Sequence, residues 1–75
     1  MSKLRRVSGA QAIRALERLG FVQVRQRGSH VVLKKETPEG FVGCVVPLHN
    51  ELAIGTLRGI LRQARVSTEE FLANL

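Results

Sequence analysis

The order of apolar and polar residues divides this chain into helical and extended segments, and the first segment is helical. Apolar residues recur at helical spacing over 12–19, and polar residues fill the opposite side. Ser8 and Gln11 have the spacing of a capping box, in which each side chain bonds the other residue's backbone N–H, and Gly20 is a typical stop signal. This pattern predicts a first helix over 8–19.

In the middle of the chain the pattern of apolar and polar residues is typical of strands. Residues 21–25 and 31–33 are rich in strand formers, and Gly28 and Ser29 supply turn chemistry between them. A second turn rich in proline and glycine precedes the apolar run 41–46. The pattern predicts a three-stranded antiparallel meander that ends at Pro47.

A second amphipathic segment follows the strands. Its apolar spacing predicts a helix over 54–64, whose outward side carries Arg58, Arg62 and Arg65. Gly55 or Thr56 is expected to cap the start of this helix. Gly59, which costs about 1 kcal/mol relative to alanine inside a helix, is expected to allow close packing against the sheet.

The remaining pattern completes a single α+β domain. Ser67 and Glu70 form another possible capping box, which predicts a short last helix. The order α-β-β-β-α-α over residues 1–75 favours a three-stranded antiparallel sheet with helices on one face and water on the other. At 75 residues there is room for one domain only.

Strand alternation assigns side chains to the two faces of this sheet. If Val31 and Leu33 face the core together with Lys35, then His30 and Lys34 lie on the exposed face. The three phenylalanines and the single cysteine are best explained as core residues: Phe21, Phe41, Phe71 and Cys44.

Charge is distributed unevenly along the chain. Up to Lys35 there are nine cations and one anion, a balance of +8, whereas the remainder has three cations and five anions, a balance of −2. This polarity favours a polyanionic partner over a generally basic surface. A lone cysteine and a polar N-terminus without an apolar run suggest a cytoplasmic protein with no membrane segment.

His30 is the residue with the clearest chemical potential. An isolated histidine is usually structural or solvated, but this one follows a Gly-Ser turn in a cationic neighbourhood: Arg25, Arg27, Lys34 and Lys35. RNA carries its own nucleophile, the 2′-hydroxyl, so cleavage needs only proton transfer, for which histidine is suited near neutral pH. The expected site therefore combines His30 with these four cations and with Gly28 and Ser29, and needs no metal or cofactor.

Other chemistries fit less well. Ser29 and His30 are neighbours in sequence and would point to opposite faces of a strand, which disfavours a serine hydrolase. Cys44, His49 and His30 lack the close ligand spacing of a zinc site. The start of the second helix could hold a phosphate, although capping is the preferred interpretation there. With tyrosine and tryptophan absent, base stacking has little to work with.

The residues also resemble a known family. Five segments occur in this order along the chain: LERLGF (16–21), GSH (28–30), PLH (47–49), GTLRGILRQA (55–64) and EF (70–71). Through these segments the chain is similar to HicA-type toxins, the small mRNA interferases of bacterial toxin–antitoxin pairs. The resemblance implies a fold like the double-stranded RNA-binding domain and cleavage of mRNA with His30 as the catalytic residue. It also implies a HicB-type antitoxin that covers this face, so the toxin would be monomeric alone and heteromeric with its antitoxin.

Two alternatives remain beside an endoribonuclease toxin. The same fold order and charge fit a non-catalytic double-stranded RNA-binding module, and the basic side could instead dock an acidic protein. His49 is expected to cap or pack near the second helix rather than to act in catalysis.

Overall fold

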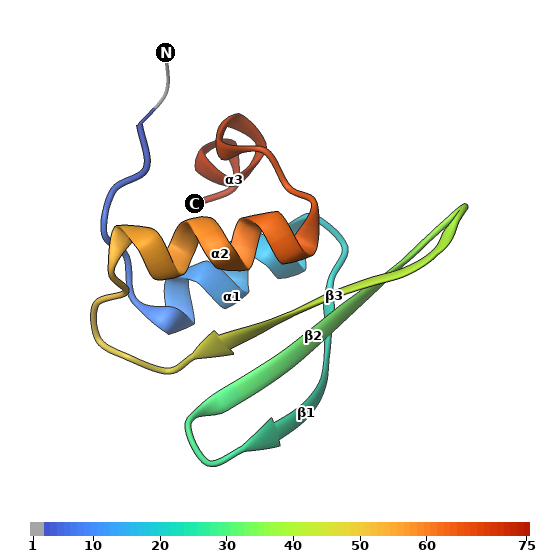
Figure 1. The fold of residues 1–75 in the computed structure, drawn as a ribbon, viewed down its shortest axis with the longest axis horizontal. Coiled ribbons are helices and arrows are strands. Elements are labelled where there is room, and N and C mark those ends of the chain that lie inside the picture. Colours follow the sequence, from blue (N-terminus) through green and yellow to red (C-terminus); the bar gives the residue numbers. More distant parts are fainter. Residues whose placement is uncertain (1–2) are drawn as a thin grey trace.

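The computed structural model describes residues 3–75 and contains three helices and three strands in the expected order (Figure 1). The elements are α1 (Gly9–Arg18), β1 (Val22–Arg27), β2 (His30–Thr37), β3 (Gly40–Pro47), α2 (Ile54–Ala64) and α3 (Thr68–Ala73). The strands form one antiparallel sheet in the order β1-β2-β3. The predicted α+β meander is confirmed.

Capping boxes begin α1 and α3, as the sequence predicts. The Gln11 backbone N–H donates to Ser8 Oγ at 3.0 Å, and the Ser8 N–H donates to Gln11 Oε1 at 2.8 Å. Ser67 and Glu70 make the same reciprocal pair, both bonds at 3.1 Å. Each box satisfies two backbone donors that the first turn leaves without helical partners.

The start of α2 differs from the expectation. Ala53 is the N-cap residue and makes no side-chain cap bond, so the prediction that Gly55 or Thr56 caps this helix is wrong. Both residues lie inside the first turn because the helix begins at Ile54. The packing role expected of Gly59 is also wrong, since a Cβ at this residue would meet nothing within 4 Å.

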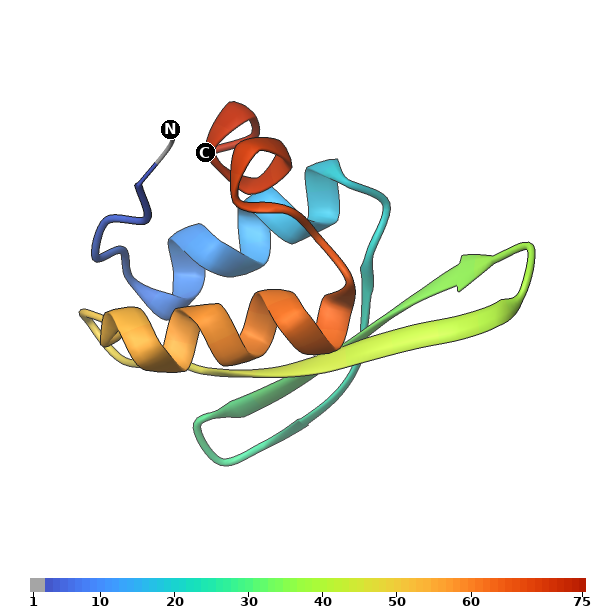
Figure 2. The same cartoon turned by 45° about the horizontal axis from the view of Figure 1, so that its top comes forward.

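The helices cover one face of the sheet only. Both α1 and α2 contact β3, whereas α3 contacts α1 and lies farther from the strands (Figures 1 and 2). Val31 and Leu33 of β2 and Cys44 and Val46 of β3 are buried under these helices. The predicted core side of β2 is therefore confirmed, and the opposite face is open.

The three phenylalanines do not share one environment. Phe21 and Phe71 are buried, at 2% and 0% exposure, but Phe41 is 69% exposed, so its prediction as a core residue is wrong. Phe41 pairs with Glu36 near the β2–β3 turn, and this turn projects beyond the helices in both views (Figures 1 and 2). None of the helices within residues 3–75 is placed to cover its ring.

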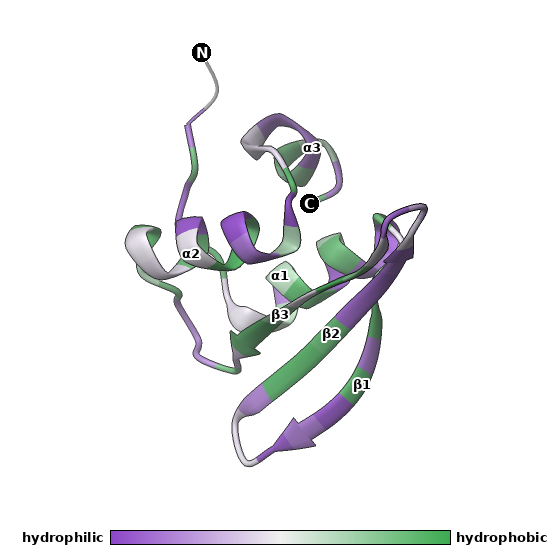
Figure 3. Ribbon diagram, turned by 45° about the vertical axis from the view of Figure 1, so that its right-hand side comes forward, coloured by the Kyte–Doolittle hydropathy of each residue, from purple (hydrophilic) through white to green (hydrophobic). Residues whose placement is uncertain are grey.

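Strand β1 is an edge strand with a β-bulge. Its register with β2 shifts between Gln23 and Arg25, which leaves Val24 as the extra residue. All six residues of β1 are exposed, and its colouring in Figure 3 changes from mixed apolar and polar in the first half to hydrophilic toward the β1–β2 turn. Among the described residues, 3–75, no helix is long and apolar enough to cross a membrane.

Candidate functional site

His30 is the first residue of β2 and follows a two-residue hairpin turn. Gly28 has φ of +57°, a conformation that glycine adopts without a steric penalty, and it occupies the first central position of the turn. The Gln26 side-chain amide donates to the Gly28 carbonyl oxygen at 3.0 Å. Arg27 and His30 then pair across the two strands, so the turn places the imidazole directly beside a guanidinium-bearing residue.

Backbone bonds hold this turn against the rest of the domain. The Leu48 N–H donates to the Ser29 carbonyl oxygen at 2.7 Å, and the Gly9 N–H donates to the His49 carbonyl oxygen at 2.9 Å. Gly9 is required at the start of α1 because a Cβ there would overlap the Pro47 carbonyl oxygen. The histidine is exposed, but its backbone belongs to a fixed scaffold.

His49 contacts the rest of the fold through its main chain. Its carbonyl oxygen accepts from the first residue of α1, and its side chain is exposed. The expected capping of the second helix is wrong, since α2 has no side-chain cap and its N-cap residue is Ala53.

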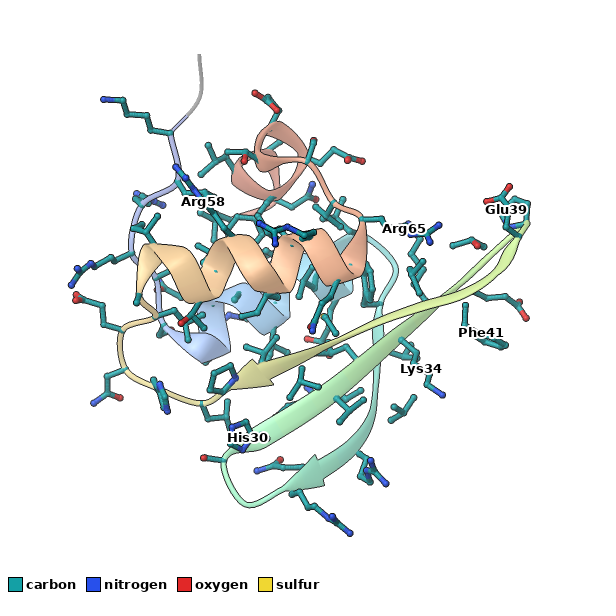
Figure 4. All side chains as sticks on the ribbon, in the orientation of Figure 1. His30, Lys34, Glu39, Phe41, Arg58 and Arg65 are labelled. Carbon is teal, nitrogen blue, oxygen red and sulfur yellow. The ribbon has the colours of Figure 1, made fainter. Side chains whose placement is uncertain are left out.

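The open face of the sheet gathers most of the predicted site residues. Strand register places Arg27 opposite His30, Arg25 opposite Val32, and Lys34 two residues further along β2. His30, Arg25, Arg27 and Lys34 are all exposed. A shallow hollow of about 290 Å³ lies between Val24, Arg25, Val32 and Lys34. Figure 4 shows His30 at the start of β2 and Lys34 farther along it, away from α2.

Lys35 does not join this group. Alternation turns it to the helix side of β2, where it is half-buried and its Nζ lies 5.9 Å from the Phe21 ring centroid. It lines a separate hollow of about 210 Å³ together with Arg65 and Glu70. Of the predicted cations, the structure therefore brings Arg25, Arg27 and Lys34 to one face with His30 and leaves Lys35 on the other.

Phe41 is a residue of the open face that sequence reasoning missed. The Lys34 Nζ lies 5.9 Å from its ring centroid. Counting back by twos from the buried Val46 and Cys44 places Val42 inward and Phe41 outward. This alternation was the available signal, but the apolar residues on both sides of β3 conceal it.

Neither the Cys44 thiol nor a cluster of metal-binding side chains offers a second kind of chemistry at this face. Burial raises the pKa of the Cys44 thiol to about 11, so it stays protonated near neutral pH and is a poor nucleophile. Across the described range 3–75, no three His, Cys, Asp or Glu side chains lie close enough together to hold a metal ion.

One comparison with known proteins identifies the family. The family model described as the HicA toxin of bacterial toxin–antitoxin systems matches residues 9–66, which span α1 to the end of α2. The chain belongs to the HicA toxin family. A search of curated proteins finds no match. Membership of the HicA family implies an antitoxin partner, and the matched region contains the whole open face, from β1 through β3.

Proposed function

We propose that this HicA-family chain is a metal-independent endoribonuclease that cleaves mRNA in the cytoplasm, with His30 as its general acid–base residue. The observation that carries the proposal is the exposed His30 ring on an open sheet face beside Arg27, with Arg25 and Lys34 along the same face. Imidazole transfers protons near neutral pH, and cations stabilise charge that develops on a phosphate.

The chemistry is an internal transfer within RNA. The neutral imidazole takes the proton of a 2′-hydroxyl, and the 2′-oxygen then bonds to the adjacent phosphorus. The bond from phosphorus to the 5′-oxygen breaks, this oxygen takes a proton from solvent as it leaves, and the protonated imidazole returns its proton to solvent. The products are a 2′,3′-cyclic phosphate and a 5′-hydroxyl, and neither water activation nor a covalent enzyme intermediate is needed.

The remaining site residues serve this step by position and charge. Gly28 and Ser29 set the turn, and the bond from Leu48 to the Ser29 carbonyl fixes it. Arg25 and Arg27 bind the phosphate that is attacked, and Lys34 binds the chain farther along. Lys35 has no part in this arrangement because it lies on the helix side of β2.

His30→Ala tests the proposal, with His49→Ala as the matched control. Both histidines are exposed, so both variants should keep the wild-type thermal unfolding midpoint. His30→Ala is expected to lower the RNA cleavage rate by about 10²- to 10⁴-fold and to abolish growth arrest on expression, whereas His49→Ala should retain both. Wild-type cleavage should persist in excess chelator. A folded His30→Ala protein that cuts RNA at the wild-type rate would overturn the assignment.

A second function, a non-catalytic double-stranded RNA-binding module, is favoured by the α-β-β-β-α order. This function predicts other results than the ribonuclease does. The protein would bind duplex RNA and would cut no RNA in any buffer, and His30→Ala would change binding only slightly. If the wild-type protein cuts RNA and His30→Ala abolishes this cleavage, the chain is not a non-catalytic binding module.

The antitoxin of the pair is proposed to be of the HicB type and to cover the face that carries His30. Co-expression should then restore growth, and the purified complex should neither bind nor cut RNA. A complex that keeps full cleavage activity would contradict this arrangement.

A further inference from the structure

The open face of the sheet carries an apolar surface in addition to its charges. The structure describes five large apolar side chains that are exposed, and three of them, Val22, Phe41 and Val45, point to this face by register. A fourth, Val24, lines the hollow beside Arg25 on the same face. Single exposed apolar residues are ordinary, but a cluster on one face indicates a binding surface.

Phe41 is the most exposed of these residues, and a cation lies beside it. The Lys34 Nζ is 5.9 Å from the ring centroid, within the range of a cation–π contact. Gly43 lies opposite Lys34 in the pairing of β2 with β3, and a Cβ there would contact Lys34 Cγ at 3.5 Å. The same Cβ would lie nearer, at 3.2 Å, to the Leu33 carbonyl oxygen, so the lysine stem and the Gly43 backbone are close neighbours on the open face.

The ring lies at a distance from His30 that extended RNA can span. Phe41 pairs with Glu36, six residues along β2 from His30, which corresponds to about 20 Å at the usual rise of a strand. Lys34 and Val32 occupy the outward positions between them, and Arg25 pairs with Val32 from the neighbouring strand. A nucleic-acid strand that crosses this distance meets cations first and the aromatic ring last (Figure 4).

We propose that single-stranded RNA lies across this open face, with phosphates on Arg27, Arg25 and Lys34 and one base stacked on the Phe41 ring. The proposal rests on the proposed ribonuclease function and specifies its substrate as unpaired RNA. A base within a duplex already has both faces stacked, so only an unpaired base can lie on the ring. An acidic protein would satisfy the cations but would not require a flat aromatic surface beside them, so RNA is the better fit.

The chain offers a sensitive test because it contains no tryptophan or tyrosine. In a Phe41→Trp variant the introduced indole is the only strong fluorophore, and Phe41 is exposed enough for the exchange to preserve the fold. A His30→Ala background prevents cleavage during titration. The matched control carries Ala73→Trp, at an exposed position in α3, which lies on the far side of the helices from the open face.

A short unstructured RNA should quench the fluorescence of Phe41→Trp and leave that of Ala73→Trp unchanged, and a blunt duplex of the same sequence should quench neither.

In parallel, Phe41→Ala should weaken binding of labelled single-stranded RNA by roughly 5- to 150-fold, the usual effect of losing one stacked base. Phe41→Trp should keep the affinity of the parent, whereas Phe41→Leu, which retains bulk but no flat ring, should not.

Three results would overturn the proposal. If RNA binds without quenching and Phe41→Ala keeps full affinity, stacking is refuted while the ribonuclease function stands. If Phe41→Ala keeps its RNA affinity but, with His30 intact, escapes suppression by the antitoxin in growth assays, the ring serves the protein partner. If no variant, including the one with Phe41 intact, binds RNA at all, both the stacking site and the proposed function fall.

Discussion

Replacing Gly59 with alanine should stabilise this protein. Gly59 lies in the interior of α2, and a Cβ at this position would meet nothing within 4 Å, so the new methyl group creates no clash. Alanine favours a helix interior over glycine by about 0.8–1.0 kcal/mol. For a domain of this size, that gain corresponds to a rise of roughly 4–8 °C in the thermal unfolding midpoint.

Gly9 provides the opposite case within the same fold. It is the first residue of α1, where alanine would also favour the helix, but its Cβ would overlap the Pro47 carbonyl oxygen. The loop after β3 would have to move, which would also strain the bond between the Gly9 N–H and the His49 carbonyl. Gly9→Ala should therefore destabilise the domain, by about 1–3 kcal/mol if the cost is that of ordinary overpacking.

Far-ultraviolet circular dichroism during heating measures both changes, and urea titration supplies the free energies. The test is whether the unfolding midpoint rises for Gly59→Ala and falls for Gly9→Ala. A Gly59→Ala protein with a lower midpoint than the wild type would refute the reasoning, because it would mean that this helix backbone packs against something. If the midpoint rises and RNA cleavage is lost, the exposed surface of α2 takes part in function and not in folding.

Two further predictions concern titratable groups. Burial raises the pKa of the Cys44 thiol in the folded state from 9.0 to about 11. The stability that the buried, protonated thiol contributes is therefore complete below pH 9.0 and is lost as the pH rises toward about 11. Over this range the free energy of unfolding should fall by about 1.4 kcal/mol per pH unit. The wild-type free energy of unfolding should fall more steeply over this range than that of Cys44→Ala; equal slopes would contradict the burial of the thiol. The backbone N–H and then the side chain of Ser67 hold the pKa of the Glu70 carboxyl below its ordinary value, so this cap stabilises the fold above the unfolded pKa and is lost as pH falls through the folded pKa. Ser67→Ala should cost about 1 kcal/mol near neutral pH. Glu70→Gln, which removes the carboxyl but keeps a side-chain oxygen for the Ser67 N–H, should make unfolding less dependent on pH in the acidic range, and a Glu70→Gln curve parallel to that of the wild type would argue against the lowered pKa.

Local sequence signals were sufficient for the helices and the order of elements. A capping box requires only two residues three positions apart, so Ser8 with Gln11 and Ser67 with Glu70 could be recognised without tertiary information. The side of β2 that faces the core also followed from alternation, because polar His30 and Lys34 flank Val32 on the outer side.

Features that depend on neighbouring elements were not predictable in the same way. Strand β3 is apolar on both faces, so its pattern does not show that Phe41 lies beyond the reach of the helices. The start of α2 at Ile54, with no capping side chain, follows from how the preceding loop packs: Leu52 is fully buried and its N–H bonds the Val7 carbonyl. At the site, charge grouped Lys35 with Lys34, although alternation along β2 already placed the two on opposite faces, and the structure follows the alternation.

Only one face of the sheet is under helices, and this separates the residues that fold the protein from those proposed to meet its partners. Substitutions at exposed positions such as Arg25 or Phe41 remove no buried contact and should change stability by no more than about 0.5 kcal/mol. For an engineer, the exposed side chains of the uncovered face can be varied together without compensating mutations in the core, as long as Gly28 and Gly43 are kept.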